Sequence, residues 1–286
     1  GFGIVNSDGN IVDLMDTEKV KALNSDLHNL KTSNNIDAVI VYGCGAGVPA
    51  LDPIYNLRFY FDKPRQPILW EMWDGKLVSF GKKDADPDYQ WKEYYYCDFY
   101  LLNHQKAFSF ERMDYWCEGI SFDKLKLVPR TVYDEIMHTL VQQPVKEVTI
   151  FQPGPWGAYR YKDLGEQFDV PGLDCNAWNE LAGPELSMLI DFGGAEMLNM
   201  PAMNLMQYAD KFVGKYLNET YQGLFPLDVW LDDGYFPKPE PTERTSMPIH
   251  SHPSTDYIKR HFKESIGRYE TYYIAEAYEG ANTWMG

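Results

Sequence analysis

Apolar residues recur at helical spacing in three stretches of the chain. Between Asp16 and Thr32 they return every three or four residues while charged residues occupy the other side, which predicts an amphipathic helix. The same spacing predicts a short helix over 131–142, with Thr131 as its N-cap, and a third helix over 203–218. These three segments are the helices that the pattern indicates directly.

Other apolar stretches favour strands. IDAVIVY, residues 36–42, is almost continuously apolar and follows the first helix, so it is expected to form a buried strand in an α/β layer structure covered on both faces. Residues 54–116 are rich in aromatic side chains, and the run WKEYYYCDFYLLNHQKAF within them is compatible with either one helix or two strands. After residue 147, short β-branched and aromatic segments alternate with Gly, Pro and Asp turns, a pattern typical of an antiparallel sandwich or barrel.

The length of 286 residues favours two domains. Pro144 ends the helix predicted over 131–142, and the pattern of elements changes after it, so the boundary is placed between residues 142 and 147. We therefore expect an α/β module over residues 1–145 and a mainly-β unit over residues 146–286.

Composition and charge narrow the classes of partner. The formal charge of −16 repels phosphate backbones and anionic lipid headgroups, which argues against nucleic acid and membrane surfaces as partners. The four cysteines are widely spaced, without a CxxC pair, and no apolar run is long enough to span a bilayer. These features favour a folded cytoplasmic protein with reduced thiols, and they leave its oligomeric state open.

The glycine cluster GCGAG, residues 43–47, raises the question of a phosphate-binding loop. It lacks the Lys-Ser or Lys-Thr of a P-loop, its third glycine falls one residue early for GxGxxG, and Pro49 stands where a helix would begin. A tight turn after a strand is the better interpretation.

Two histidines and a later carboxylate form the candidate metal site. His250 and His252 are two residues apart and would share one face of a strand, and Glu270 lies eighteen residues after the second histidine, in a strand-like aromatic run. Imidazole nitrogens and a carboxylate oxygen are the ligands that zinc prefers, although a solvated turn beside a structural glutamate would explain the same residues. Ser254 or Thr255 is expected to cap a short helix that ends near Phe262.

This segment is similar to the metal-binding segment of type I mannose-6-phosphate isomerases. In that family a Gln-x-His-Pro strand leads through a short helix to Gly-Lys-Thr-Glu and an aromatic strand; here the corresponding letters are HSHP, residues 250–253, and GRYETYY, residues 267–273. Upstream, FQPGPWGAYRYKDLG, residues 151–165, resembles the family's opening strand with its Trp-Gly turn. The resemblance covers residues 147–286. Residues 1–145 also resemble the kinase-like α/β module that precedes the isomerase in larger bacterial members.

The resemblance implies a fold and an activity. The expected fold is an α/β module followed by the leading part of a cupin-like jelly-roll barrel, and the expected reaction is the zinc-dependent interconversion of mannose 6-phosphate and fructose 6-phosphate through an enediol. His250, His252 and Glu270 would be the metal ligands, while Arg268 would be an electrostatic helper; the general base is not assigned. The alternative is a non-catalytic carbohydrate-binding or regulatory cupin-like protein.

The chain also departs from the family pattern. His250 replaces the family's glutamine, and Arg268 replaces its lysine with a cation that does not readily shuttle a proton. The family's last histidine ligand and its phosphate-contacting arginine would fall after residue 286. We therefore expect a truncated site, with isomerase activity only in a longer natural chain.

Overall fold

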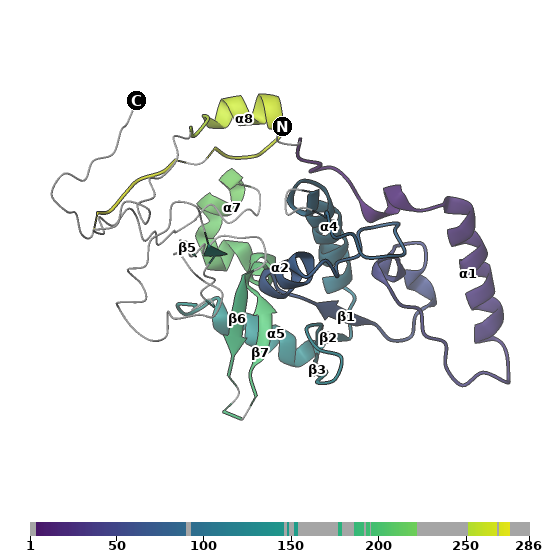
Figure 1. The fold of residues 1–286 in the computed structure, drawn as a ribbon. Coiled ribbons are helices and arrows are strands. Elements are labelled where there is room, and N and C mark those ends of the chain that lie inside the picture. The colour runs from purple at the N-terminus through teal and green to yellow at the C-terminus, as the bar shows by residue number, and fades with distance from the viewer. Residues whose placement is uncertain are drawn as a thin grey trace.

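The computed structural model describes residues 4–89, 93–145, 148, 186–191, 193–194, 196–221, 251–267 and 269–274, together with two short strands at 152–153 and 177–178. Figure 1 shows helices of the first half around a small sheet, with α8 (Thr255–Phe262) near the amino-terminal segment of the chain. Within the described residues, no helix combines the length and the apolar character that a bilayer crossing needs.

Helices dominate the first half of the described chain. After the 3-10 turn η1 (Ile11–Leu14) they are α1 (Thr17–Lys31), the 3-10 turns η2 (Cys44–Gly47) and η3 (Asp52–Ile54), α2 (Arg65–Trp73), the π-helix η4 (Tyr94–Asp98), α4 (Phe99–Phe110) and α5 (Arg130–Leu140).

The central sheet has three strands in the order β1-β2-β3. The strands β1 (Phe59–Asp62) and β2 (Tyr115–Glu118) are parallel, with Asp62 opposite Glu118, and β3 (Lys126–Pro129) is antiparallel to β2. Two antiparallel ribbons follow: β4 (Gln152–Pro153) with β5 (Ala177–Trp178), and β6 (Ser187–Ile190) with β7 (Leu198–Pro201). None of the sheets formed by the described residues closes into a barrel, so the jelly-roll stays a prediction.

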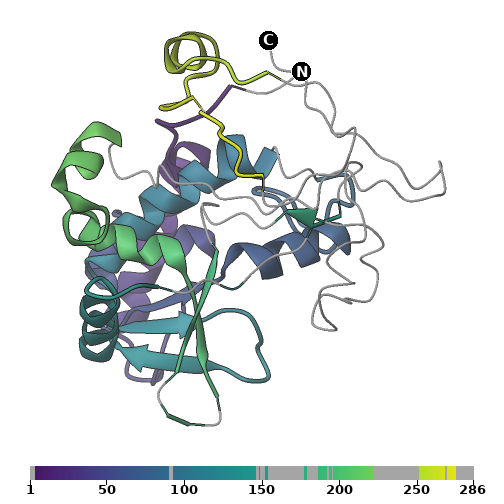
Figure 2. The same ribbon diagram turned by 90° about the vertical axis from the view of Figure 1, so that its left-hand side faces the viewer.

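The largest hydrophobic core combines residues from both sides of the expected domain boundary. Strand β7 packs against β2, and the 3-10 helix η6 (Ala202–Tyr208) packs against α5 (Figure 2). The buried side chains of this core are Phe110, Met113, Trp116, Tyr133, Ile136, Met137, Val141, Met188, Leu198, Met200 and Leu205. Residues 186–205 therefore share a core with the first module, while the division at residue 145 stays a prediction.

A buried carboxylate ties this core together. Asp62, at the end of β1, is only 3% exposed, and its Oδ1 lies 3.0 Å from the ammonium of Lys106 on α4. Its Oδ2 accepts hydrogen bonds from the indole N–H of Trp116 at 3.1 Å and from the amide of Asn204 at 2.9 Å. Because a buried charge needs such partners, Asp62 links β1, α4, β2 and η6 at one point.

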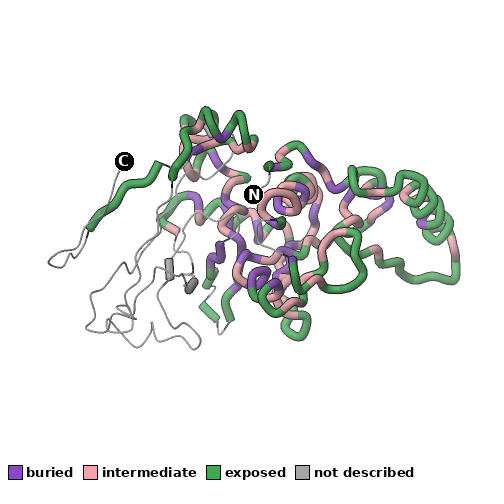
Figure 3. Tube along the Cα trace, turned by 45° about the horizontal axis from the view of Figure 1, so that its top comes forward, coloured by how far each residue is buried: buried purple, intermediate pink, exposed green. Residues whose placement is uncertain are grey.

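The prediction for the first helix is confirmed, and the one for the following strand is wrong. Helix α1 begins after Asp16, whose carboxylate accepts hydrogen bonds from the backbone N–H groups of Glu18 and Lys19. Figure 3 shows this helix as largely exposed. Residues 36–42 form no strand, and Ile40 and Tyr42 are 83% and 90% exposed. No neighbouring strand pairs with this segment among the described residues, so its apolar pattern does not lead to burial.

Other sequence predictions have mixed outcomes. The aromatic run after residue 90 is helical, as η4 followed by α4, which decides between the two forms left open. The helix predicted over 131–142 is α5, but it begins one residue earlier and Pro129 is its N-cap in place of Thr131. Residues 203–218 are helical but divided into η6, the π-helix η7 (Asp210–Gly214) and α7 (Lys215–Tyr221). The cluster 43–47 contains the 3-10 turn η2, in keeping with a turn.

Candidate metal centre

His252 and Glu270 meet in the structure. The Nε2 atom of His252 lies 2.6 Å from Oε2 of Glu270, and the two side chains are 28% and 29% exposed. This distance is that of a hydrogen bond or, with a protonated imidazole, of an ion pair. Of the four residues that the sequence singles out, these two are therefore brought together, whereas His250 and Arg268 lie outside the described residues.

The chain between His252 and Glu270 forms a short helix and then turns back toward its start. Helix α8 begins after Ser254, whose hydroxyl accepts a hydrogen bond from the backbone N–H of Tyr257 at 3.3 Å, as expected of an N-cap. Ile258 is its buried residue, and Lys263 ends it in a left-handed conformation with φ of 59°. The chain after this cap returns toward the start of the helix, so residues before and after α8 become neighbours.

Gly267 is the point of closest return. Its backbone N–H donates to the hydroxyl of Thr255 at 3.0 Å. A Cβ at this position would lie 2.7 Å from the carbonyl oxygen of Pro253 and 2.8 Å from the backbone nitrogen of Thr255. Both atoms belong to the backbone and cannot turn aside, so this close approach requires glycine.

Replacing Gly267 by alanine is expected to separate the two segments. The methyl group cannot be accommodated without moving the backbone, so the His252–Glu270 contact should open and zinc affinity should fall by roughly tenfold or more, comparable to losing a group that orients a metal ligand. Isothermal titration with zinc measures this effect. The control is Gly194→Ala, because a Cβ at Gly194 meets no atom within 4 Å and its φ is not positive. The neighbouring Gly193 is not used, because its positive φ would add backbone strain. Equal zinc affinity in G267A and wild type would contradict the role of this glycine.

An imidazole nitrogen and a carboxylate oxygen are donor types that zinc accepts, and here the two atoms lie in direct contact at 2.6 Å. Two ligands of one tetrahedral zinc stand roughly 3.3 Å apart when each bond is about 2.0–2.1 Å, so the 2.6 Å pair would open by less than about 1 Å to share an ion. The hydroxyl of Tyr272 donates to the other carboxylate oxygen of Glu270, which orients this group. Within the described residues no third histidine, cysteine or carboxylate completes a metal-binding group.

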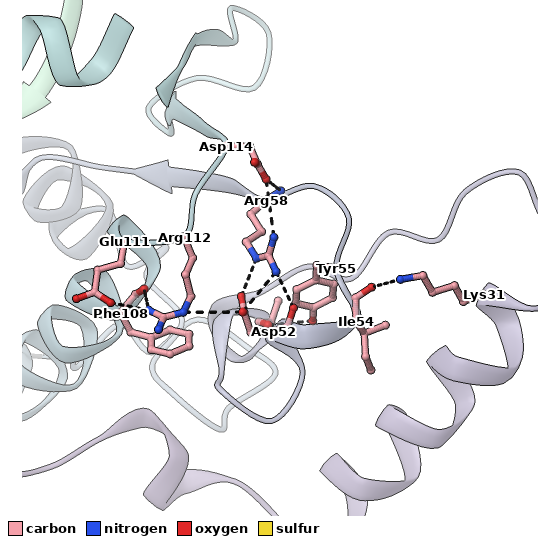
Figure 4. Close-up of polar contacts among 10 residues, drawn as sticks. Lys31, Asp52, Ile54, Tyr55, Arg58, Phe108, Glu111, Arg112 and Asp114 are labelled. Carbon is pink, nitrogen blue, oxygen red and sulfur yellow. Dashed lines mark hydrogen bonds and ion pairs between the residues drawn. The ribbon is translucent and has the colours of Figure 1, made fainter. Parts of the chain in front are cut away.

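A second polar cluster, formed by Arg58, Arg112, Asp52 and Asp114, has a structural role in joining elements of the fold. Nε of Arg58 lies 2.7 Å from Oδ1 of Asp52, and its backbone N–H donates to Asp114 at 2.7 Å (Figure 4). Arg112 approaches the same Asp52 carboxylate at 3.9 Å and also donates to the carbonyl of Phe108 at 2.8 Å. Both guanidinium groups therefore have protein partners, and the network fastens η3 to β1 and to the end of α4.

Comparison with protein families gives a match over the first half of the chain. Residues 1–142 match a domain of unknown function, DUF8485. No curated protein and no solved structure matches the chain. The matched region ends just after α5, so the contact between His252 and Glu270 lies outside it.

The sequence named Gly267 and Tyr272 only as letters of the resemblance and Thr255 only as a possible helix cap, without a role at the metal site. A glycine shortly after a predicted helix is usually taken as part of the helix stop, and only the backbone contact with Pro253 shows its second role. Tyr272 stands two residues from Glu270, and alternation along an extended segment would have placed both on one face.

Proposed function

We propose that this chain carries ligands of a zinc-dependent sugar-phosphate isomerase that interconverts mannose 6-phosphate and fructose 6-phosphate. The contact between His252 and Glu270 carries the proposal, because residues eighteen positions apart meet at 2.6 Å with the donor types that the resemblance requires. The other interpretation of this sequence, a solvated turn beside a structural glutamate, is compatible with the same contact as a plain ion pair, so zinc uptake is the measurement that separates the two.

Three side chains would hold the ion: His252 and Glu270, which the structure describes, and His250, which lies outside the described residues. When bound, a divalent ion with an open position supplies an electrophile for charge that develops on a substrate oxygen. The hydroxyl of Tyr272 restrains the second oxygen of Glu270 and so limits rotation of this carboxylate.

The substrate is an anion and the chain is strongly acidic, so phosphate binding would need specific cations. Arg268, two residues before Glu270, would be an electrostatic helper, because its planar guanidinium is suited to gripping a phosphate group or to polarising an oxygen. Arg268 lies outside the described residues.

Two measurements test the proposal. Purified protein stripped of metal and exposed to micromolar zinc should take up one ion per chain, measured by elemental analysis after desalting. The natural protein loaded with zinc should then convert mannose 6-phosphate to fructose 6-phosphate in a coupled assay. Zinc uptake without turnover would favour the non-catalytic carbohydrate-binding alternative, and absence of uptake would contradict the metal site itself.

A further inference from the structure

The carboxyl-terminal end of α8 contacts residues near the start of the chain. The N–H of Val5 donates to the carbonyl oxygen of Phe262, in the last turn of α8, at 3.0 Å. The next residue, Asn6, donates its N–H to the carbonyl of Tyr96 in η4 at 2.8 Å. Two successive N–H groups thus connect the last turn of α8 with the π-helix η4, and Figures 1 and 2 show the amino-terminal segment beside α8.

The contact with Val5 satisfies a backbone carbonyl at the end of α8. The last four carbonyl groups of an α-helix have no partner within it, and Val5 provides one for Phe262. Val5 is only 2% exposed, so this hydrogen bond is protected from water. A hydrogen bond protected in this way restrains fraying of the helix end.

A side-chain contact reinforces the same junction. Glu264 follows α8 by two residues, and its carboxylate interacts with the hydroxyl of Tyr96. Burial of Tyr96 raises the pKa of its hydroxyl, and the charge of Glu264 and a hydrogen bond to it raise this pKa further. Burial, followed by the charge of Glu264, also raises the pKa of Tyr100 to about 12. Tyr96 therefore meets the carboxylate of Glu264 as a neutral hydroxyl.

We propose that Val5, Asn6, Tyr96 and Glu264 are positioning residues that clamp α8 against the first module and thereby hold His252 and Glu270 in register. The module matched by the domain of unknown function then has a defined role: it is the support on which the ligand-bearing segment is mounted. The consequence for metal binding rests on the proposed function, but the clamp itself does not.

Few residues separate the clamp from the two ligands. Ser254 caps α8, and after the chain has passed Glu264, Gly267 packs on the backbone of residues 253–255 at the start of this helix. Releasing the end of α8 from Val5 and Tyr96 would free both arms of this turn. His252 and Glu270, at the tips of these arms, would then spend less time at contact distance.

Hydrogen exchange and zinc titration of the full 286-residue chain test the clamp. Val5→Pro removes the N–H that reaches Phe262, and Glu264→Ala removes the contact with Tyr96 without altering the backbone. Each change should speed exchange of the α8 amides, such as that of Ile258, by roughly threefold to tenfold, the effect of losing one hydrogen bond. Zinc affinity should fall by a similar factor.

The controls separate the clamp from general destabilisation. Val5→Ala keeps the N–H and loses only part of the buried side chain, and Ile4→Pro makes the proline change at a residue that is 61% exposed. Amides of α5, which packs in the main core, report on global opening and should keep their exchange rates in all four variants. Unchanged α8 exchange in V5P and E264A would overturn the clamp, and faster exchange with unchanged zinc affinity would overturn its positioning role. If the wild type takes up no zinc, the proposed function fails while the exchange data still decide the clamp.

Discussion

Replacing Asp62 by alanine is expected to lower the free energy of unfolding by about 3–5 kcal/mol, the cost of breaking a buried ion pair from one side. The substitution leaves the ammonium of Lys106 buried opposite an apolar methyl group, and it removes the acceptor used by Trp116 and Asn204. Urea unfolding followed by tryptophan fluorescence measures the effect, because Trp116 is fully buried beside the lost carboxylate.

Two further variants make this prediction specific. Asp74→Ala removes a carboxylate from an ion pair with Lys76 in which both side chains are mostly exposed, so no measurable loss is expected. Combining D62L with Lys106→Met removes both buried charges and should recover the part of the D62A loss that comes from the uncompensated ammonium, while the loss of the acceptor for Trp116 and Asn204 remains. A D62A protein as stable as the wild type would show that the carboxylate is not a buried support of the fold.

Replacing His252 by alanine, or Glu270 by glutamine, should weaken zinc binding by roughly a hundredfold or more. Structural zinc sites bind with about 10–16 kcal/mol from about four ligands, so losing one ligand removes on the order of a quarter of this free energy. Competition with a chromogenic zinc chelator measures the dissociation constants.

His261 provides the matched control. It is an exposed histidine in the last turn of α8, its ring 4.3 Å from that of Tyr257, and H261A should bind zinc like the wild type. Equal loss of affinity in H261A and H252A would show that zinc binds to surface histidines without selection, which contradicts a site at His252.

The helices that sequence patterns predict well are those with local stop and start signals. Asp16 and Ser254 each cap a helix through contacts within three residues, so the sequence alone is enough to place α1 and α8. The start of α5 was misplaced by one residue because Pro129 and Thr131 both suit a helix start, and the tertiary structure selects the proline.

Strands and buried charges depend on distant residues. The segment Ile36–Tyr42 has the composition of a buried strand, but a strand needs a partner that its own letters do not specify. The environment of Asp62 likewise arises from Lys106, Trp116 and Asn204, which are 44, 54 and 142 residues away by their numbering. No local pattern distinguishes this aspartate from a solvated one.

The candidate site was predictable to the extent that it resembles a known arrangement. The pairing of His252 with Glu270 followed from ligand type and order, whereas the need for glycine at 267 depends on a backbone contact across α8. The clamp formed by Val5 and Asn6 uses backbone N–H groups, which every residue except proline carries. A side-chain pattern in the sequence therefore does not predict it.

X-ray absorption spectroscopy of the zinc-loaded protein tests the central claim most directly, because it reports the atoms bound to the ion. We predict nitrogen and oxygen ligands at about 2.0–2.2 Å with imidazole scattering that decreases in H252A, and a changed oxygen contribution in E270Q. A protein that takes up no zinc, a shell containing sulfur, or spectra that are identical in wild type, H252A and E270Q would contradict a cation shared by His252 and Glu270.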